Sequence, residues 1–188
     1  MSRITPLSDE RASDEVQRVY AYVKERYGKL PLPVSVSANH PEVFRAYIGY
    51  ESLIVQARRL DKKLKALASV KVAALNGCPF CIDLGSAEVR DAGMSERQMR
   101  ELPSYAESDA FSKTEKIVLD YAIAMTRSPV RVEDELSADL QRHFDDAQII
   151  EFTAVIAWEN DRSRFNHALG LESQGFSEGV ACVLPETS

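Results

Sequence analysis

The chain has 188 residues, of which 45% are hydrophobic and 28% charged, a composition typical of one folded globular domain. Its formal net charge of −6 offers no basic surface for the phosphate backbone of a nucleic acid or for an anionic lipid surface. No stretch approaches the roughly 20 apolar residues that a transmembrane helix needs. We therefore expect a single domain over residues 1–188 that lies in the cytoplasm and binds neither nucleic acid nor membrane.

Apolar residues recur at three- and four-residue spacings along most of the chain, and no run of alternating β-branched and polar residues suggests a strand. The sequence therefore predicts an all-α fold of about seven to eight helices with no sheet. We expect helices over residues 14–27, 41–59, 61–77, 78–91, 134–144 and 146–168, two more that open at Ser95 and Ser112, a connector over 29–37, and an irregular, loosely packed tail over 171–188.

Local signals set several of these boundaries. Ser95 with Gln98 and Ser112 with Glu115 have the spacing of a capping box, so each pair predicts a helix start. Gly77 is expected to end the third helix, which places Cys78 at the junction with the fourth.

The pair Cys78 and Cys81, with Pro79 and Phe80 between them, is the strongest chemical signal in the chain. A cysteine at a helix N-terminus lies near unpaired backbone N–H groups and the positive end of the helix dipole, which favours the nucleophilic thiolate. The second thiol, one turn away, is within reach to form a disulfide with the first. The pattern predicts redox chemistry in a reducing compartment, and either thiol could be the one that attacks.

Two other interpretations of the pair are weaker. Two small hydrophobic residues could fall three positions apart by chance. A zinc site would need Cys182, His143 or His167 as further ligands, and none has the spacing of a ligand motif, so we expect no metal and no cofactor. A thioredoxin-like site is disfavoured because the segment before Cys78 is predicted to be a helix, not a strand.

Residues 64–93, LKALASVKVAALNGCPFCIDLGSAEVRDAG, resemble the core motif of the carboxymuconolactone decarboxylase superfamily, in particular its alkylhydroperoxidase D (AhpD)-like members, and residues 158–166 give weaker support. The resemblance implies an all-helical bundle with a core over about residues 40–130 that assembles into homo-oligomers, commonly trimers or hexamers. It also implies a thiol peroxidase that reduces organic hydroperoxides through the dithiol, with electrons from a dithiol or disulfide partner, or a disulfide oxidoreductase that exchanges disulfides with another redox protein.

The same resemblance exposes a departure. The redox motif of the family has a glutamate twelve residues before the first cysteine and a histidine four residues after the second, and this chain has Ala66 and Gly85 there. Glu88, seven residues after Cys81, lies on the same helical face and is our candidate for the proton relay. We expect the missing side chain at Gly85 to leave open space between them.

For four further residues that could take part in the chemistry, we favour a simpler interpretation. We expect Asp83 to be a first-turn acid favoured by the helix dipole, Lys71 to reach the surface, His167 to be a C-terminal helix residue, and Cys182 to be a free thiol. Tyr47, Tyr50 and Trp158 are expected in the core or at a subunit interface.

Two alternative functions remain at this point. One is a non-redox decarboxylase of the same superfamily, which lacks the dithiol. The other is a catalytically weak oligomeric binding or regulatory protein, for which Ala66 and Gly85 are the evidence.

Overall fold

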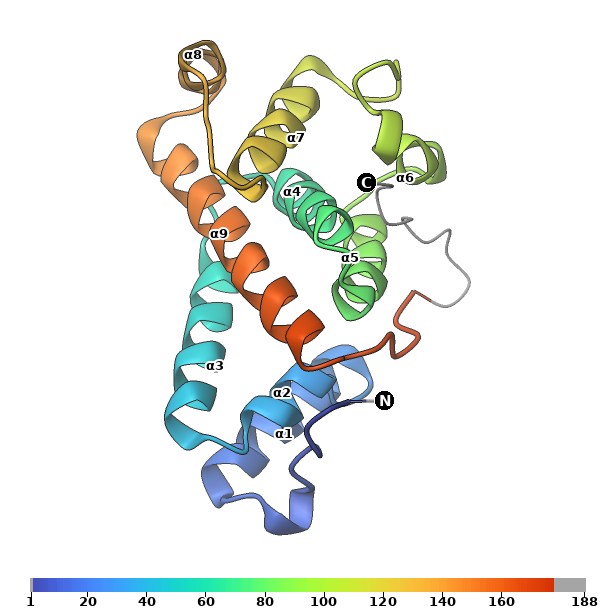
Figure 1. The fold of residues 1–188 in the computed structure, drawn as a ribbon, viewed down its shortest axis with the longest axis vertical. Helices are drawn as coiled ribbons and strands as arrows, with labels where there is room; N and C mark the ends of the chain where they lie inside the picture. Colours follow the sequence, from blue (N-terminus) through green and yellow to red (C-terminus); the bar gives the residue numbers. More distant parts are fainter. Residues whose placement is uncertain (1, 178–188) are drawn as a thin grey trace.

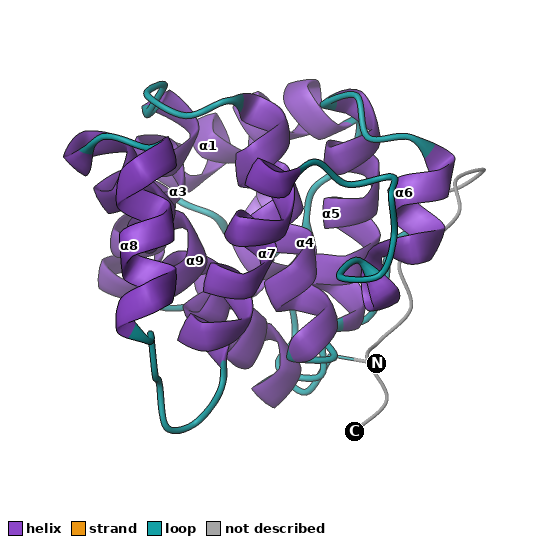
Figure 2. Cartoon of the chain, turned by 90° about the horizontal axis from the view of Figure 1, so that it is seen from above, coloured by secondary structure: helices purple, strands orange, loops and turns teal. Residues whose placement is uncertain are grey.

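The structure is a computed structural model that describes residues 2–177. Within these residues it contains helices and loops and no strand (Figures 1 and 2), which confirms the predicted all-α fold. The α-helices are α1 (Asp14–Tyr27), α2 (Leu32–Ser37), α3 (Pro41–Gln56), α4 (Lys62–Leu75), α5 (Pro79–Asp91), α6 (Glu96–Glu101), α7 (Lys113–Thr126), α8 (Asp134–His143) and α9 (Asp146–Ala168), with short 3-10 helices at Asp9–Arg11 and Leu102–Ser104.

The predicted capping signals act as expected. In both Ser95–Gln98 and Ser112–Glu115, the serine accepts a hydrogen bond from the backbone N–H three residues on, and the Gln or Glu side chain accepts one from the serine N–H. Asp61 caps α4 by accepting from two backbone N–H groups of its first turn. These caps satisfy N–H donors that have no partner inside the helix, which is why each helix begins where it does.

The predicted connector over residues 29–37 is wrong in part, because its second half forms α2. Pro33 lies in the first turn of this helix, where a backbone N–H would have no intrahelical partner. Proline therefore starts this helix instead of preventing it. The extra helix brings the total to nine within residues 2–177, against the seven to eight expected.

Helix α4 lies at the centre of the molecule and packs against α5, α7 and α9 (Figures 1 and 2). Its C-terminal two-thirds are largely apolar, and Leu67, Val70 and Val72 are fully buried. Lys71 is also buried, with only 1% of its surface exposed, so the expectation of a surface lysine is wrong. Its ammonium group donates to the Leu102 carbonyl oxygen and lies over the ring of Tyr105.

The segment after α9 is irregular as predicted, but residues 171–177 are firmly held. Leu171 is buried, and the ring of Phe176 packs edge-on against Tyr27 and Phe80. The expectation of loose packing is therefore wrong for this part of the chain. The remainder of the predicted tail, with Cys182, lies outside the described residues.

No helix in the described part of the chain is long and apolar enough to cross a membrane.

Candidate functional site

The predicted dithiol lies at the start of α5, as the sequence indicated. Gly77 adopts a left-handed conformation with φ of 61° that turns the chain from α4 into α5, and Pro79 follows as the first residue of α5. Cys78 and Cys81 form a disulfide, with their Cα atoms 5.3 Å apart. Both are buried, with 0% and 2% of their surfaces exposed.

Each sulfur accepts a hydrogen bond from an N–H group. Cys78 is the N-cap of α5, and its Sγ accepts from the backbone N–H of Cys81 at 3.2 Å. The Sγ of Cys81 accepts from the side-chain amide Nδ2 of Asn166, on α9, at 3.3 Å. The helix N-terminus and the amide both favour negative charge on sulfur, so the surroundings suit a thiolate after reduction.

The two positions that lack the family's acid–base residues differ in their surroundings. Ala66, on α4, lines a cavity between α1, α3, α4, α5 and α9 and packs against the apolar cluster that contains the dithiol. At Gly85, a Cβ atom would lie 3.4 Å from Cγ2 of Val70. The expected open space beside Gly85 is therefore wrong, because Val70 fills it.

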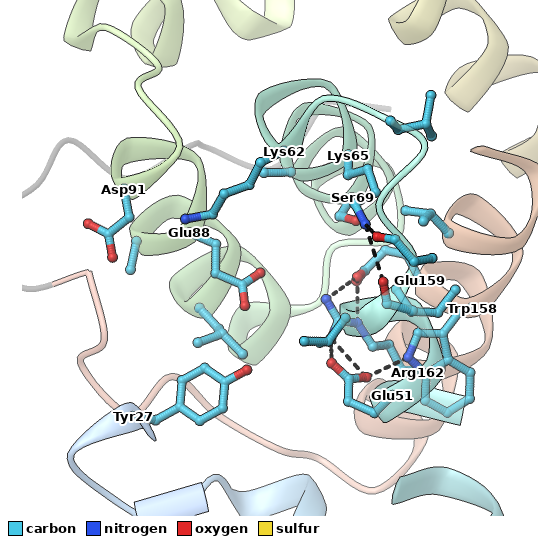
Figure 3. A pocket seen from close by; sticks show the side chains of 18 of the residues that line it. Tyr27, Glu51, Lys62, Lys65, Ser69, Glu88, Asp91, Trp158, Glu159 and Arg162 are labelled. Carbon is cyan, nitrogen blue, oxygen red and sulfur yellow. Dashed lines mark hydrogen bonds and ion pairs between the residues drawn. The ribbon is translucent and has the colours of Figure 1, made fainter. Parts of the chain in front are cut away.

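We call the cavity that Ala66 lines the main cavity. Its volume is about 800 Å³, and residues of α1, α3, α4, α5 and α9 line it (Figure 3). Phe176 also lines it. Its wall is mixed: aromatic rings of Tyr27 and Trp158 lie near the carboxylates of Glu51, Glu88 and Glu159 and the guanidinium of Arg162. Leu84 belongs both to this wall and to the apolar cluster that contains the disulfide, and Ala66 lines the cavity and packs against that cluster, so the cavity borders the cluster that holds the two sulfurs.

Glu159 and Arg162 form the polar centre of the main cavity. Arg162 donates to Glu159 and to Glu51, and the indole N–H of Trp158 also donates to Glu51 (Figure 3). The Ser163 hydroxyl donates to the second oxygen of Glu159 at 2.8 Å. Burial of Glu159 outweighs these bonds and raises the pKa of its carboxyl to about 7, so this acid gains and loses its proton near neutral pH.

Glu88 points into the main cavity from α5 (Figure 3). Burial raises the pKa of its carboxyl, while the charge of Arg162 lowers it by a smaller amount. Within residues 2–177, neither sulfur forms a hydrogen bond with Glu88 or with His167, so the structure does not bring these candidates into direct contact with the dithiol. His167 is exposed in the last turn of α9, as expected.

Asp83 has a different role from the one expected. Only 3% of its surface is exposed, and its carboxylate accepts hydrogen bonds from the backbone N–H groups of Gln174, Phe176 and Ser177 and from the Ser177 hydroxyl. Burial by itself would raise the pKa of Asp83, but these bonds outweigh it and hold the pKa at about 2. Asp83 thus fastens the segment after α9 to the helix that carries the dithiol.

Sequence reasoning missed Glu159, Arg162 and Asn166 as residues of the site. Glu159, Ser163 and Asn166 recur at four- and three-residue spacing, so they share one face of α9, and all three are buried. A polar stripe on the buried face of a long helix was the available signal.

The fold and the buried dithiol place this protein in the class of all-helical proteins that carry a CxxC site. The model of the carboxymuconolactone decarboxylase family matches residues 41–124. The uncharacterized protein YnjA of Escherichia coli (strain K12) is 30% identical to this chain over 173 residues, which cover 91% of the chain and 92% of YnjA. The chain therefore belongs to the carboxymuconolactone decarboxylase family.

Two solved structures have the same fold. The AhpD core of a peroxidase-related protein from Ralstonia eutropha JMP134 superposes with a TM-score of 0.83 at 21% identity, over 93% of this chain and 94% of that one. The debrominase Bmp8, without ligand, superposes with a TM-score of 0.82 at 21% identity, over 92% of each chain. The predicted AhpD-like fold is thereby confirmed.

Proposed function

We propose that this protein is a dithiol oxidoreductase that reduces organic hydroperoxides through Cys78 and Cys81. The observation that carries the proposal is the disulfide between these cysteines at the start of α5, where both sulfurs accept hydrogen bonds from N–H groups. The AhpD-like fold supports it, as does a cavity that borders the apolar cluster containing the dithiol.

The reaction balances without a cofactor. One thiolate attacks the outer oxygen of the hydroperoxide, the O–O bond breaks, and the products are a sulfenic acid and an alcohol. The other thiol then displaces water from the sulfenic acid and forms the disulfide. A dithiol electron donor, of the kind that a reducing cytoplasm supplies, restores both thiols and becomes a disulfide itself.

Proton delivery is the step that Ala66 and Gly85 leave unassigned. The alkoxide that leaves in the first step needs a proton, and general acid catalysis of such a transfer is typically worth a factor of about 10² to 10⁴. Glu88 and Glu159 are the acids of the main cavity whose pKa values burial raises, which keeps them protonated to higher pH than ordinary carboxyls. We assign the proton relay to this pair, acting through the cavity.

A homo-oligomer, a trimer or hexamer by family resemblance, is part of the proposal. The surface of α3 supports it, because Val43, Tyr50 and Leu53 are exposed there by 43%, 38% and 67%. An apolar helix face of this kind favours association with another subunit.

Two alternatives make different predictions for the thiols. A non-redox decarboxylase or a binding protein would not need a reactive pair, so its cysteines would titrate near the ordinary thiol pKa of about 8.5. The proposed function requires at least one thiol with a lower pKa. Titration of the reduced protein by ultraviolet absorbance of the thiolate separates these cases.

The direct test is steady-state turnover. The reduced protein should consume cumene hydroperoxide with dithiothreitol as the electron donor, and Cys78→Ser or Cys81→Ser should lower the rate at least about 100-fold. Cys182→Ser is the matched control, because it removes the third thiol and should leave turnover unchanged. A wild-type rate no higher than that of Cys78→Ser and Cys81→Ser would refute the proposal.

A further inference from the structure

Asn166 is a buried amide on α9 whose nearest reactive neighbour is the dithiol. Only 1% of its surface is exposed, and its Nδ2 group donates to Sγ of Cys81 at 3.3 Å. The two residues are 85 positions apart in the sequence, so the packing of α9 against α5 creates the contact.

The other end of the same amide is unsatisfied. The Oδ1 atom of Asn166 is buried and has no hydrogen-bond partner among the residues that the structure describes. Burying a polar atom without a partner costs free energy, so packing alone does not explain an asparagine here. An apolar side chain of the same size would fill the space without that cost.

The contact with sulfur gains strength when the disulfide is reduced. A disulfide sulfur is a weak acceptor, whereas a thiolate is a charged acceptor and forms much stronger hydrogen bonds, especially where water is excluded. We infer that Asn166 is a catalytic residue that stabilises the thiolate of Cys81 by donating an amide hydrogen to its sulfur. The inference rests on the proposed dithiol function and assigns one residue within it.

The role applies to the step in which the enzyme is reduced. A thiolate of the dithiol donor attacks Sγ of Cys78, a new S–S bond forms, and the Cys78–Cys81 bond breaks with its electron pair on Cys81. Asn166 Nδ2 already points at the sulfur that receives this charge. The second thiol of the donor then displaces Cys78, which takes up a proton, and the donor leaves as a disulfide.

The charged groups on the elements around this contact are held elsewhere. Asp83, on α5, binds the segment at 174–177, and Lys71, on α4, binds the Leu102 carbonyl oxygen. On α9 itself, Glu159 is bound by Arg162 and Ser163. Arg162, also on α9, binds Glu159 and Glu51, and no hydrogen bond joins Glu88 or His167 to either sulfur within residues 2–177. The side-chain donor that the structure places on the Cys81 sulfur is the neutral amide of Asn166.

The test measures the pKa of Cys81 as a single thiol. In full-length protein with Cys78→Ser and Cys182→Ser, the rate of alkylation by iodoacetamide is followed from pH 5 to 10. Serine at position 78 retains a good N-cap for α5. Adding Asn166→Leu removes the donor at similar volume and should raise the pKa of Cys81 by about one to two units, the range expected for a hydrogen bond to a charged group.

Asn166→Asp is the second variant, because it keeps the shape of the side chain but replaces the donor with an anion. It should raise the pKa of Cys81 further than leucine does. The matched control is Asn160→Leu, which removes a partly buried amide from the same helix that bonds to Thr126 and Asn76 and not to sulfur. This control should leave the pKa of Cys81 unchanged, and circular dichroism checks that each variant is folded.

Two results would overturn the inference. One is a Cys81 pKa that stays the same in folded Asn166→Asp or Asn166→Leu. The other is an equal rise in Asn160→Leu, which would show a general effect of loosening α9. Because alkylation needs no hydroperoxide, a wild-type protein without peroxidase turnover would refute the proposed function and leave this test intact.

Discussion

Replacing Asp83 with asparagine tests how the segment after α9 is fastened beside the dithiol. The carboxylate uses both oxygens: Oδ2 accepts from the N–H groups of Gln174 and Phe176, and Oδ1 accepts from Ser177. An asparagine side chain of the same shape keeps one acceptor and turns an NH₂ group toward two backbone donors. The bonds on that side are lost, and donors face each other there.

The pKa of Asp83 sets the size of the effect. A pKa of about 2 in the folded protein, against an ordinary value of 3.8, corresponds to about 2 kcal/mol in favour of the bound carboxylate. Because the folded pKa is the lower one, this stabilisation is fully present above about pH 4 and is lost as the pH falls toward 2. At pH 3 about half of it should remain.

Hydrogen exchange of the backbone amides at 174, 176 and 177 is the appropriate assay, because the segment can open without unfolding the whole protein. A loss of about 2 kcal/mol predicts exchange roughly 30-fold faster in Asp83→Asn at pH 7. Asp91→Asn, an exposed acid at the end of the same helix, is the control and should exchange like the wild type. Equal protection in Asp83→Asn and Asp91→Asn would refute the reasoning.

Three further predictions follow from the geometry. Gly85→Ala should raise the free energy of unfolding, measured by urea titration, by about 0.5–1 kcal/mol, because a glycine inside a helix is costly and the new Cβ would meet Val70 at ordinary contact distance. A lower free energy of unfolding in Gly85→Ala would show that Val70 cannot accommodate the added methyl group. Glu88→Gln should lower hydroperoxide turnover about 10-fold or more while leaving the thiol pKa unchanged, and an unaltered rate would remove Glu88 from the relay. Wild-type turnover should fall above about pH 7 as Glu159 loses its proton, and Glu159→Gln should flatten that part of the pH profile; a profile of unchanged shape would contradict the role of Glu159.

Much of the fold could be predicted because its signals are local. The capping boxes at Ser95 and Ser112 act within one helical turn, and the structure confirms both. The expected bounds 14–27 and 146–168 agree with α1 and α9. Such features depend on short stretches of chain and need no knowledge of tertiary packing.

The sequence-based predictions were wrong where a local pattern is compatible with two structures, or where tertiary packing decides whether a residue is buried. Pro33 suits either a connector or the first turn of a helix, and here it starts α2. Lys71 was expected at the surface, yet its position on the central helix α4 buries it against Tyr105. Spacing alone cannot distinguish a charged residue on the packed face of a central helix from one that reaches solvent.

The residues of the candidate site also divide into those that local sequence patterns predict and those that depend on tertiary packing. Cys78 and Cys81 could be found from the sequence, because their spacing and the glycine before them define a helix start. The polar stripe on α9 contains Asn166, but its contact with Cys81 could not be predicted, because that contact depends on how α9 crosses α5. The raised pKa of Glu159, in the same stripe, could not be predicted either, since it comes from burial in the assembled bundle.

A single-turnover experiment tests the central claim most directly. Reduced protein, freed of reductant, is mixed with one equivalent of cumene hydroperoxide, and the alcohol and the protein thiols are both measured. The account predicts one alcohol formed per chain, with the loss of two hydrogen atoms from the peptide that carries Cys78 and Cys81. Hydroperoxide that persists while both thiols remain titratable, or oxidation confined to Cys182, would contradict it.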